Sequence, residues 1–157
     1  MAGGRDHYTL ETVAHRDHYK IKDVDERDGW LDGEHRWRKE GLPDKLHVGW
    51  DIYDVQTRWR SDSSIAHDSK ARAQLSRDAG RFLCEFILYE SLSRRYQEDG
   101  ERVGKVAFLH VPGGYGTEDV ERGVRVAEAA IRSLVASWEE GHRASEREAG
   151  VARTFVA

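Results

Sequence analysis

The run VAFLHVP, residues 106–112, is the feature that most restricts the fold of this 157-residue chain. It is almost continuously apolar until Pro112, which is typical of a central strand buried on both faces. Such a strand needs helices on both sides of its sheet. Helical patterns precede it at 82–93 and follow it at 117–138. The sequence therefore predicts an α/β fold with a three-layer mixed or parallel sheet and helices on both faces.

Each of these two helices is expected to bury one apolar stripe against the sheet. In the first helix the stripe consists of Phe82, Phe86, Tyr89 and Ser93, broadened by Leu83, Ile87 and Leu88. In the second helix the inward residues are expected to be Val124, Ala127, Ile131, Leu134 and Trp138.

Three further elements are predicted. YTLETVA, residues 8–14, and AQLS, residues 73–76, have the composition of short strands. Asp51 can cap a helix in which Ile52, Val55 and Trp59 have helical spacing. This order of strands and helices supports the α/β prediction.

The remaining segments have no regular apolar period. Residues 31–49 mix charges, glycine and single aromatics, so we expect an irregular surface excursion there. We interpret 1–140 as one domain with a divergent insertion at about 25–75, and 141–157 as a loose C-terminal tail.

Composition excludes several classes of function. Charged residues make up 34% of the chain, but they are interspersed and the net charge is −4, so no face is suited to nucleic acid. The single cysteine excludes an intrachain disulfide and any site that needs two thiolates. The sequence has no signal-peptide pattern and no apolar run that could span a bilayer, so we expect a cytosolic protein.

Cys84 is that single cysteine, and it lies in the first turns of the helix that follows Asp78 and Gly80. Backbone N–H groups at a helix start favour an anion and lower the pKa of a thiol. A cysteine among large apolar residues is nevertheless usually structural. Residue pattern alone favours the structural interpretation.

His110 is a titratable residue at the end of an otherwise apolar strand. It is either a hydrogen-bonded core histidine or a reacting group at the carboxyl end of a strand, where active sites of α/β sheets collect. If the crossover from the Cys84 helix into this strand is parallel, Cys84 and His110 meet at one edge of the sheet.

A cysteine–histidine pair needs a third group that orients the imidazole. Glu11 is the most suggestive acid, since it interrupts a β-patterned stretch between Leu10 and Val13. It could equally lie on the solvent side of a half-exposed strand.

Other candidates are weaker. His15 and His18 lie three residues apart but lack a third metal ligand. VPGGYG has the glycines of a phosphate loop without the following Gly-Lys-Ser/Thr. Tryptophans and arginines between Trp30 and Arg60 could form a protein- or RNA-binding surface, although partly covered aromatics explain them as well.

The stretch SRDAGRFLCEFILYESL, residues 76–92, followed by VAFLHVP, closely resembles pyroglutamyl peptidase type I (pyrrolidone carboxyl peptidase), a family of cytosolic cysteine peptidases. That family carries its nucleophile in an Asp-Ala-Gly-Arg-Tyr-Leu-Cys-type turn and its histidine in an Ile/Val-His-Val/Ile-Pro strand end. MAGGR, YTLE and AHRDHYK are similar to its Gly-Gly-Arg turn and the strand of its catalytic glutamate. The resemblance covers about residues 1–24 and 76–135.

The resemblance implies that Cys84 is the nucleophile, His110 the base and Glu11 the orienting carboxylate, and that Lys20 assists the oxyanion. It implies removal of an N-terminal pyroglutamyl residue from peptide substrates, with no metal or organic cofactor.

The chain departs from the family at its start, because it lacks the first strand and the Gly-Phe-x-Pro-Phe loop that lines the pyroglutamyl pocket. We therefore expect a sheet without its N-terminal strands, weak or absent activity for the isolated chain, and homo-oligomer formation through an exposed sheet edge. The alternative function is a non-catalytic α/β remnant that acts as a protein-interaction module.

Overall fold

The computed structural model describes residues 6–19, 22, 24–28, 33–100 and 106–154. For residues 142–154 it describes the backbone alone. Its elements are β1 (Tyr8–Glu11), β2 (Val13–His15), α1 (His35–Lys39), β3 (Lys45–His47), α2 (Ile52–Ser61), β4 (Ala73–Ser76), α3 (Leu83–Asp99), β5 (Phe108–His110) and α4 (Thr117–Thr154). The mixed α/β prediction is confirmed.

The described strands form two small sheets. In the first, the order is β4-β1-β5; β1 is parallel to β4 and antiparallel to β5. The second sheet pairs β2 with β3 in antiparallel fashion. The expected parallel crossover is therefore wrong, since β4 and β5 run in opposite directions on either side of β1. The physical reason is that α3 packs on β2 and β3, so it does not carry the chain back along β1.

Thr12 divides the predicted strand 8–14 into β1 and β2. Its N–H and its hydroxyl Oγ1 both donate to the carbonyl of Ser76, each at 2.8 Å. Its own carbonyl accepts from the N–H of Val48 at 3.1 Å. The chain thus leaves the first sheet and joins the second within one residue.

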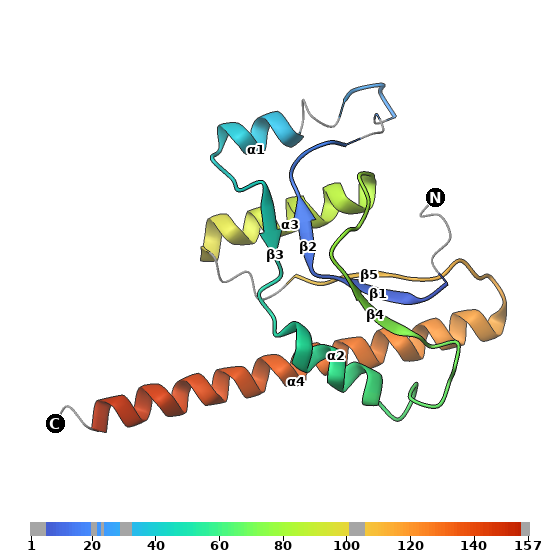
Figure 1. Ribbon diagram of the computed structural model, residues 1–157, viewed down its shortest axis with the longest axis vertical. Coiled ribbons are helices and arrows are strands. Elements are labelled where there is room, and N and C mark those ends of the chain that lie inside the picture. The colour runs from blue at the N-terminus through green and yellow to red at the C-terminus, as the bar shows by residue number, and fades with distance from the viewer. Residues whose placement is uncertain (1–5, 20–21, 23, 29–32, 101–105, 155–157) are drawn as a thin grey trace.

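α2 and α4 form the layer that covers the three-stranded sheet (Figure 1). Asp51 caps α2 as predicted, because its carboxylate accepts from the N–H groups of Tyr53 and Asp54 at 3.0 Å. The indole Nε1 of Trp59 donates to the carbonyl of Val126 in α4 at 3.0 Å. This buried bond fixes the register of the two helices.

The expected surface excursion at 31–49 is wrong for its described residues. α1 and β3 lie in this segment, and the side chains of Trp37, Leu42 and Leu46 are buried in the core. Its apolar residues are single and widely spaced, yet each one turns inward while the charges between them remain exposed. Trp37, Trp50 and Trp59 are all buried, so none of these three contributes to the binding surface considered between Trp30 and Arg60. Trp30 lies outside the described residues.

The buried faces of α3 and α4 differ from the expected stripes. On α3, Leu83 and Ile87 are exposed whereas Glu85 is fully buried. On α4, Val124 and Ile131 are exposed, and the inward face consists of small residues: Val126, Ala129, Ala130, Ser133 and Ser137. Small side chains let α2 and α4 approach each other closely, so the face that α4 buries is decided by this packing and the larger apolar residues remain outside.

α4 also extends further than the sequence suggests, since its backbone is helical to Thr154. The alanines, glutamates and arginines of 141–154 favour helix. The loose C-terminal tail at 141–157 stays a prediction. The domain limits and the insertion at 25–75 stay predictions. Within the described ranges, the helices are too polar or too short to cross a bilayer.

Candidate active site

The turn after β4 fixes the position at which α3 begins. Gly80 has φ of +84°, a left-handed conformation that glycine adopts without strain. The carboxylate of Asp78 accepts from the N–H of Gly80 at 3.0 Å and pairs with Arg81 at 3.1 Å. The chain then becomes extended at Phe82 and enters the helix at Leu83.

Cys84 is the second residue of α3 and is half-buried. The residue before the helix, Phe82, provides no side-chain cap for the first turn. The first N–H groups of an α-helix have no intrahelical acceptor, and they place partial positive charge around this position. An oxyanion that forms next to this helix start is therefore favoured.

Glu11 and His110 form a buried hydrogen-bonded pair. The imidazole Nδ1 of His110 donates to Oε1 of Glu11 at 2.8 Å, and the two residues are 7% and 0% exposed. In the register, Thr9 is opposite His110 and Glu11 is opposite Phe108, so the pair crosses diagonally on one face of the sheet. Because Nδ1 is engaged, Nε2 is the nitrogen left to exchange a proton with another group.

The structure brings Glu11 and His110 together but does not bond Cys84 to them: among the described residues, no hydrogen bond joins its sulfur to His110. The turn that leads to Cys84 nevertheless begins directly after Ser76, the residue of β4 that pairs with Glu11 of β1. Lys20, the predicted oxyanion residue, lies outside the described residues.

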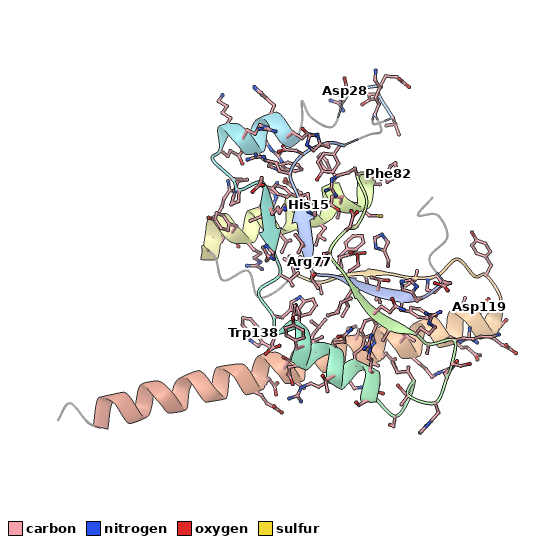
Figure 2. The ribbon with its side chains drawn as sticks, viewed as in Figure 1. His15, Asp28, Arg77, Phe82, Asp119 and Trp138 are labelled. Carbon is pink, nitrogen blue, oxygen red and sulfur yellow. The ribbon has the colours of Figure 1, made fainter. Side chains whose placement is uncertain are left out.

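A second carboxylate–imidazole pair, in which only the carboxylate is fully buried, ties α3 to β2. Oε1 of Glu85 lies 2.8 Å from Nδ1 of His15 and accepts from the N–H of the same residue. Arg81 approaches the same oxygen at 3.4 Å. Figure 2 shows His15 on β2, over α3, and Phe82 at the start of that helix. The pair therefore anchors the turn of helix that carries Cys84.

Sequence reasoning missed this pair. Its signal is the acidic residue in the middle of FLCEFIL, where an exposed site would not be flanked by apolar residues on both sides. His15 was considered only as a weak metal ligand with His18, which is exposed. In the part of the chain that the structure describes, no cluster of three histidine, cysteine or acidic side chains is placed to hold a metal ion.

Glu85 predicts a pH dependence of stability. Burial raises its pKa above the ordinary value of 4.5, although the hydrogen bonds from His15 and the charge of Arg81 oppose the shift. Between the ordinary pKa of the unfolded state and the raised pKa of the folded state, the folded state binds more protons than the unfolded state. The free energy of unfolding therefore falls as pH rises through this window. We expect Glu85→Gln to lose less free energy of unfolding than the wild type as the pH rises above 4.5, measured by urea denaturation at a series of pH values. Equal pH slopes for the two proteins would contradict the prediction.

The chain was compared with known proteins. No protein-family model matches it, and no curated protein matches it in sequence. Several solved structures match it in fold. A pyrrolidone carboxyl peptidase from Thermococcus litoralis is 16% identical with a TM-score of 0.61, and the match covers 87% of this chain and 63% of that one.

Two further structures give similar values. Pyrrolidone carboxyl peptidase from Pyrococcus furiosus is 20% identical with a TM-score of 0.57, covering 87% of this chain and 65% of that one. Pyroglutamyl peptidase I from Bacillus amyloliquefaciens is 18% identical with a TM-score of 0.56, covering 83% and 60%. The chain thus spans less than two thirds of the length of these enzymes. It has the fold of pyrrolidone carboxyl peptidases over the part that it shares with them.

Proposed function

We propose that this chain is a cysteine-type peptidase that removes an N-terminal pyroglutamyl residue from peptides, with Cys84, His110 and Glu11 as its catalytic residues. The observation that carries the proposal is the buried hydrogen bond from Nδ1 of His110 to Glu11. A carboxylate in this position holds the imidazole in one tautomer and stabilises its protonated form. The fold shared with pyrrolidone carboxyl peptidases supports the choice of substrate class.

In the first step of the proposed reaction, Nε2 of His110 takes the proton of the Cys84 thiol. The thiolate attacks the carbonyl carbon that joins the pyroglutamyl residue to the peptide. The C–N bond then breaks, and the proton on His110 passes to the leaving amine. The result is a pyroglutamyl thioester on Cys84 and a free shortened peptide.

In the second step, His110 removes a proton from water, and the resulting hydroxide attacks the thioester carbonyl. The C–S bond breaks and pyroglutamate leaves. The proton on His110 passes to the sulfur, which restores the thiol of Cys84 and the neutral imidazole. The oxyanion formed in both steps is stabilised by the first N–H groups of α3. Lys20 stays a predicted contributor to that stabilisation.

Two properties moderate the expected activity. Cys84 has no hydrogen bond to His110 among the described residues, and catalytic hydrogen bonds of this kind often tighten only when substrate binds. The match also leaves more than a third of the Thermococcus litoralis enzyme uncovered. We therefore propose weak turnover, in the cytosol, by a chain that can self-associate through β5, which pairs only with β1 among the described strands.

The single cysteine makes a specific test possible. We expect iodoacetamide to add one carbamidomethyl group at Cys84, and hydrolysis of a fluorogenic pyroglutamyl amide to fall in proportion to that adduct, as measured by intact mass and fluorescence. The rate of alkylation should drop in His110→Ala, because the imidazole no longer accepts the thiol proton. Turnover that survives complete alkylation would exclude Cys84 as the nucleophile.

A further inference from the structure

A cavity of about 500 Å³ lies at the N-terminal end of α4, between the start of β1, the loop before β4 and the Pro-Gly-Gly segment after β5. Its size is that of a site for a small molecule. It is separate from the candidate active site, because Tyr8 alternates with Thr9 along β1 and so points to the face opposite His110. The proposed peptidase reaction uses none of its side chains.

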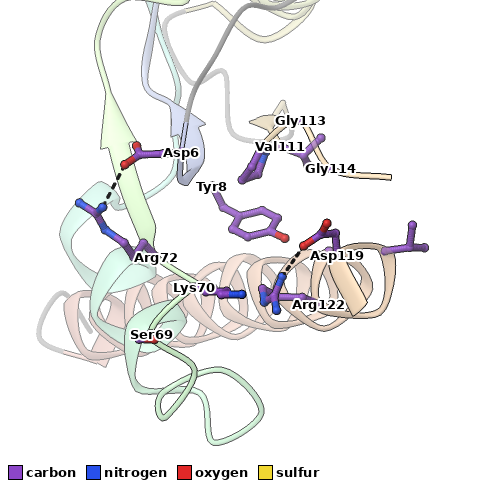
Figure 3. A pocket seen from close by; sticks show the side chains of 13 residues that line it. Asp6, Tyr8, Ser69, Lys70, Arg72, Val111, Gly113, Gly114, Asp119 and Arg122 are labelled. Carbon is purple, nitrogen blue, oxygen red and sulfur yellow. Dashed lines mark hydrogen bonds and ion pairs between the residues drawn. The ribbon is translucent and has the colours of Figure 1, made fainter. Parts of the chain in front are cut away.

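The hydroxyl of Tyr8 is the most informative feature of this cavity. The residue is only 4% exposed, and its side chain extends into the cavity toward Asp119 and Arg122 (Figure 3). Within the described part of the chain, this hydroxyl has no hydrogen-bond partner. Burial raises the pKa of Tyr8, so the group stays protonated and can donate. The hydroxyl oxygen is not one of the fully buried polar atoms that lack a partner, so it opens into the cavity and can donate to a ligand acceptor there.

The charges around Tyr8 indicate the sign of the ligand. Arg72 is paired with Asp6, and Arg122 is paired with Asp119 and Asp68. The ammonium group of Lys70 also lines the cavity and, among the described residues, forms no ion pair; Figure 3 shows it pointing toward Arg122. The site therefore offers one uncompensated cation beside one free hydroxyl donor.

The walls of the cavity indicate the size of the charge and the nature of the rest of the ligand. Val111, Val120 and the ring of Tyr8 provide an apolar lining. Asp119 lies in the same wall and would repel a doubly charged anion more than a singly charged one. An inorganic phosphate would leave the apolar wall uncovered.

We propose that this cavity binds a small organic monocarboxylate with an apolar body, whose carboxylate accepts from Tyr8 and Lys70 while its carbon skeleton packs on Val111 and Val120. The first turn of α4 adds partial positive charge at the same end of the cavity. The proposal does not depend on the peptidase reaction.

The test is a titration of the ¹⁵N-labelled full chain with benzoate, followed by amide chemical shifts. We expect saturable shifts confined to residues 6–8, 69–72 and 111–123, about fivefold weaker binding in Tyr8→Phe and about tenfold weaker binding in Lys70→Gln. Benzamide, which has the same ring without the charge, should not bind. Lys45→Gln, which removes an exposed lysine of β3, is the matched control and should bind benzoate as the wild type does.

Three results would overturn the proposal. Benzamide binding as tightly as benzoate would show that the carboxylate is not recognised. Unchanged affinity in both Tyr8→Phe and Lys70→Gln would place the ligand elsewhere, and since Lys70 is exposed, its variant tests this even if Tyr8→Phe is poorly folded. Phosphate binding more tightly than benzoate would assign the cavity to a different class of anion.

Discussion

Glu11→Gln is expected to lower kcat/KM for a pyroglutamyl amide by about 10³- to 10⁴-fold. The buried carboxylate accepts the Nδ1 proton of His110, and the amide of glutamine can donate to Nδ1 instead. The imidazole would then carry its proton on Nε2, which can no longer accept the proton of Cys84. The loss of negative charge also removes the stabilisation of the imidazolium. The measurement is steady-state hydrolysis, with thermal unfolding of each variant as a check on folding.

Glu90→Gln is the matched control for this experiment. Glu90 lies on α3, where its carboxylate accepts from Nε1 of Trp37 at 2.8 Å and from Arg94 at 3.0 Å. It is thus an engaged carboxylate on the helix that carries Cys84, but it does not contact His110. We expect this variant to retain wild-type kcat/KM. A similar loss in both variants would mean that Glu11 acts through stability and has no part in orienting the imidazole.

The sequence predicted most elements of the fold, because each depends on local signals. Asp51 followed by apolar residues at helical spacing gives α2, and the short β-patterned run at 73–76 gives β4. Strand direction is not local. β5 runs antiparallel to β1, and the path that decides this is set by the packing of α3 on β2 and β3. The sequence gives no direct signal for the direction of β5.

Burial was predicted less well than secondary structure. The apolar stripe with Val124 and Ile131 looked like the inward side of α4, yet the helix buries its small residues around Ala129 and Ser133. An amphipathic pattern shows which residues are apolar, but which face is covered depends on the shape of the neighbouring elements. The same limit explains why Leu83 is exposed while Glu85 is buried.

The candidate site was predicted in part. The residue pattern alone left Glu11 equally well explained as an orienting carboxylate or as a residue on the solvent side of a strand. The resemblance to pyroglutamyl peptidases selected the first alternative. The structure places Glu11 in a hydrogen bond with His110. The roles of Cys84, His110 and Glu11 in catalysis stay predictions. The pair of His15 and Glu85 and the unpartnered hydroxyl of Tyr8 were missed, since both arise from contacts between distant segments.

The largest loss of stability is expected for Trp59→Ala, at about 3–5 kcal/mol. Trp59 is fully buried between α2 and α4, so alanine leaves a cavity that rigid helices fill poorly. It also removes the donor to the carbonyl of Val126. A small domain has a free energy of unfolding of about 5–15 kcal/mol, so this change could unfold much of the population. Urea denaturation followed by circular dichroism measures it.

Two variants separate the causes of this loss. Trp59→Phe keeps most of the apolar volume but leaves the Val126 carbonyl without the indole donor, so we expect an intermediate cost of about 1–3 kcal/mol. Tyr53→Ala removes an aromatic ring from the same helix at a position that is 76% exposed, and it should change stability by less than about 0.5 kcal/mol. If Tyr53→Ala were as costly as Trp59→Ala, the loss could not be assigned to burial of the indole, since alanine has the higher helix propensity at both positions. A large loss at Trp59 alone would show that the buried contact between α2 and α4 contributes this part of the stability.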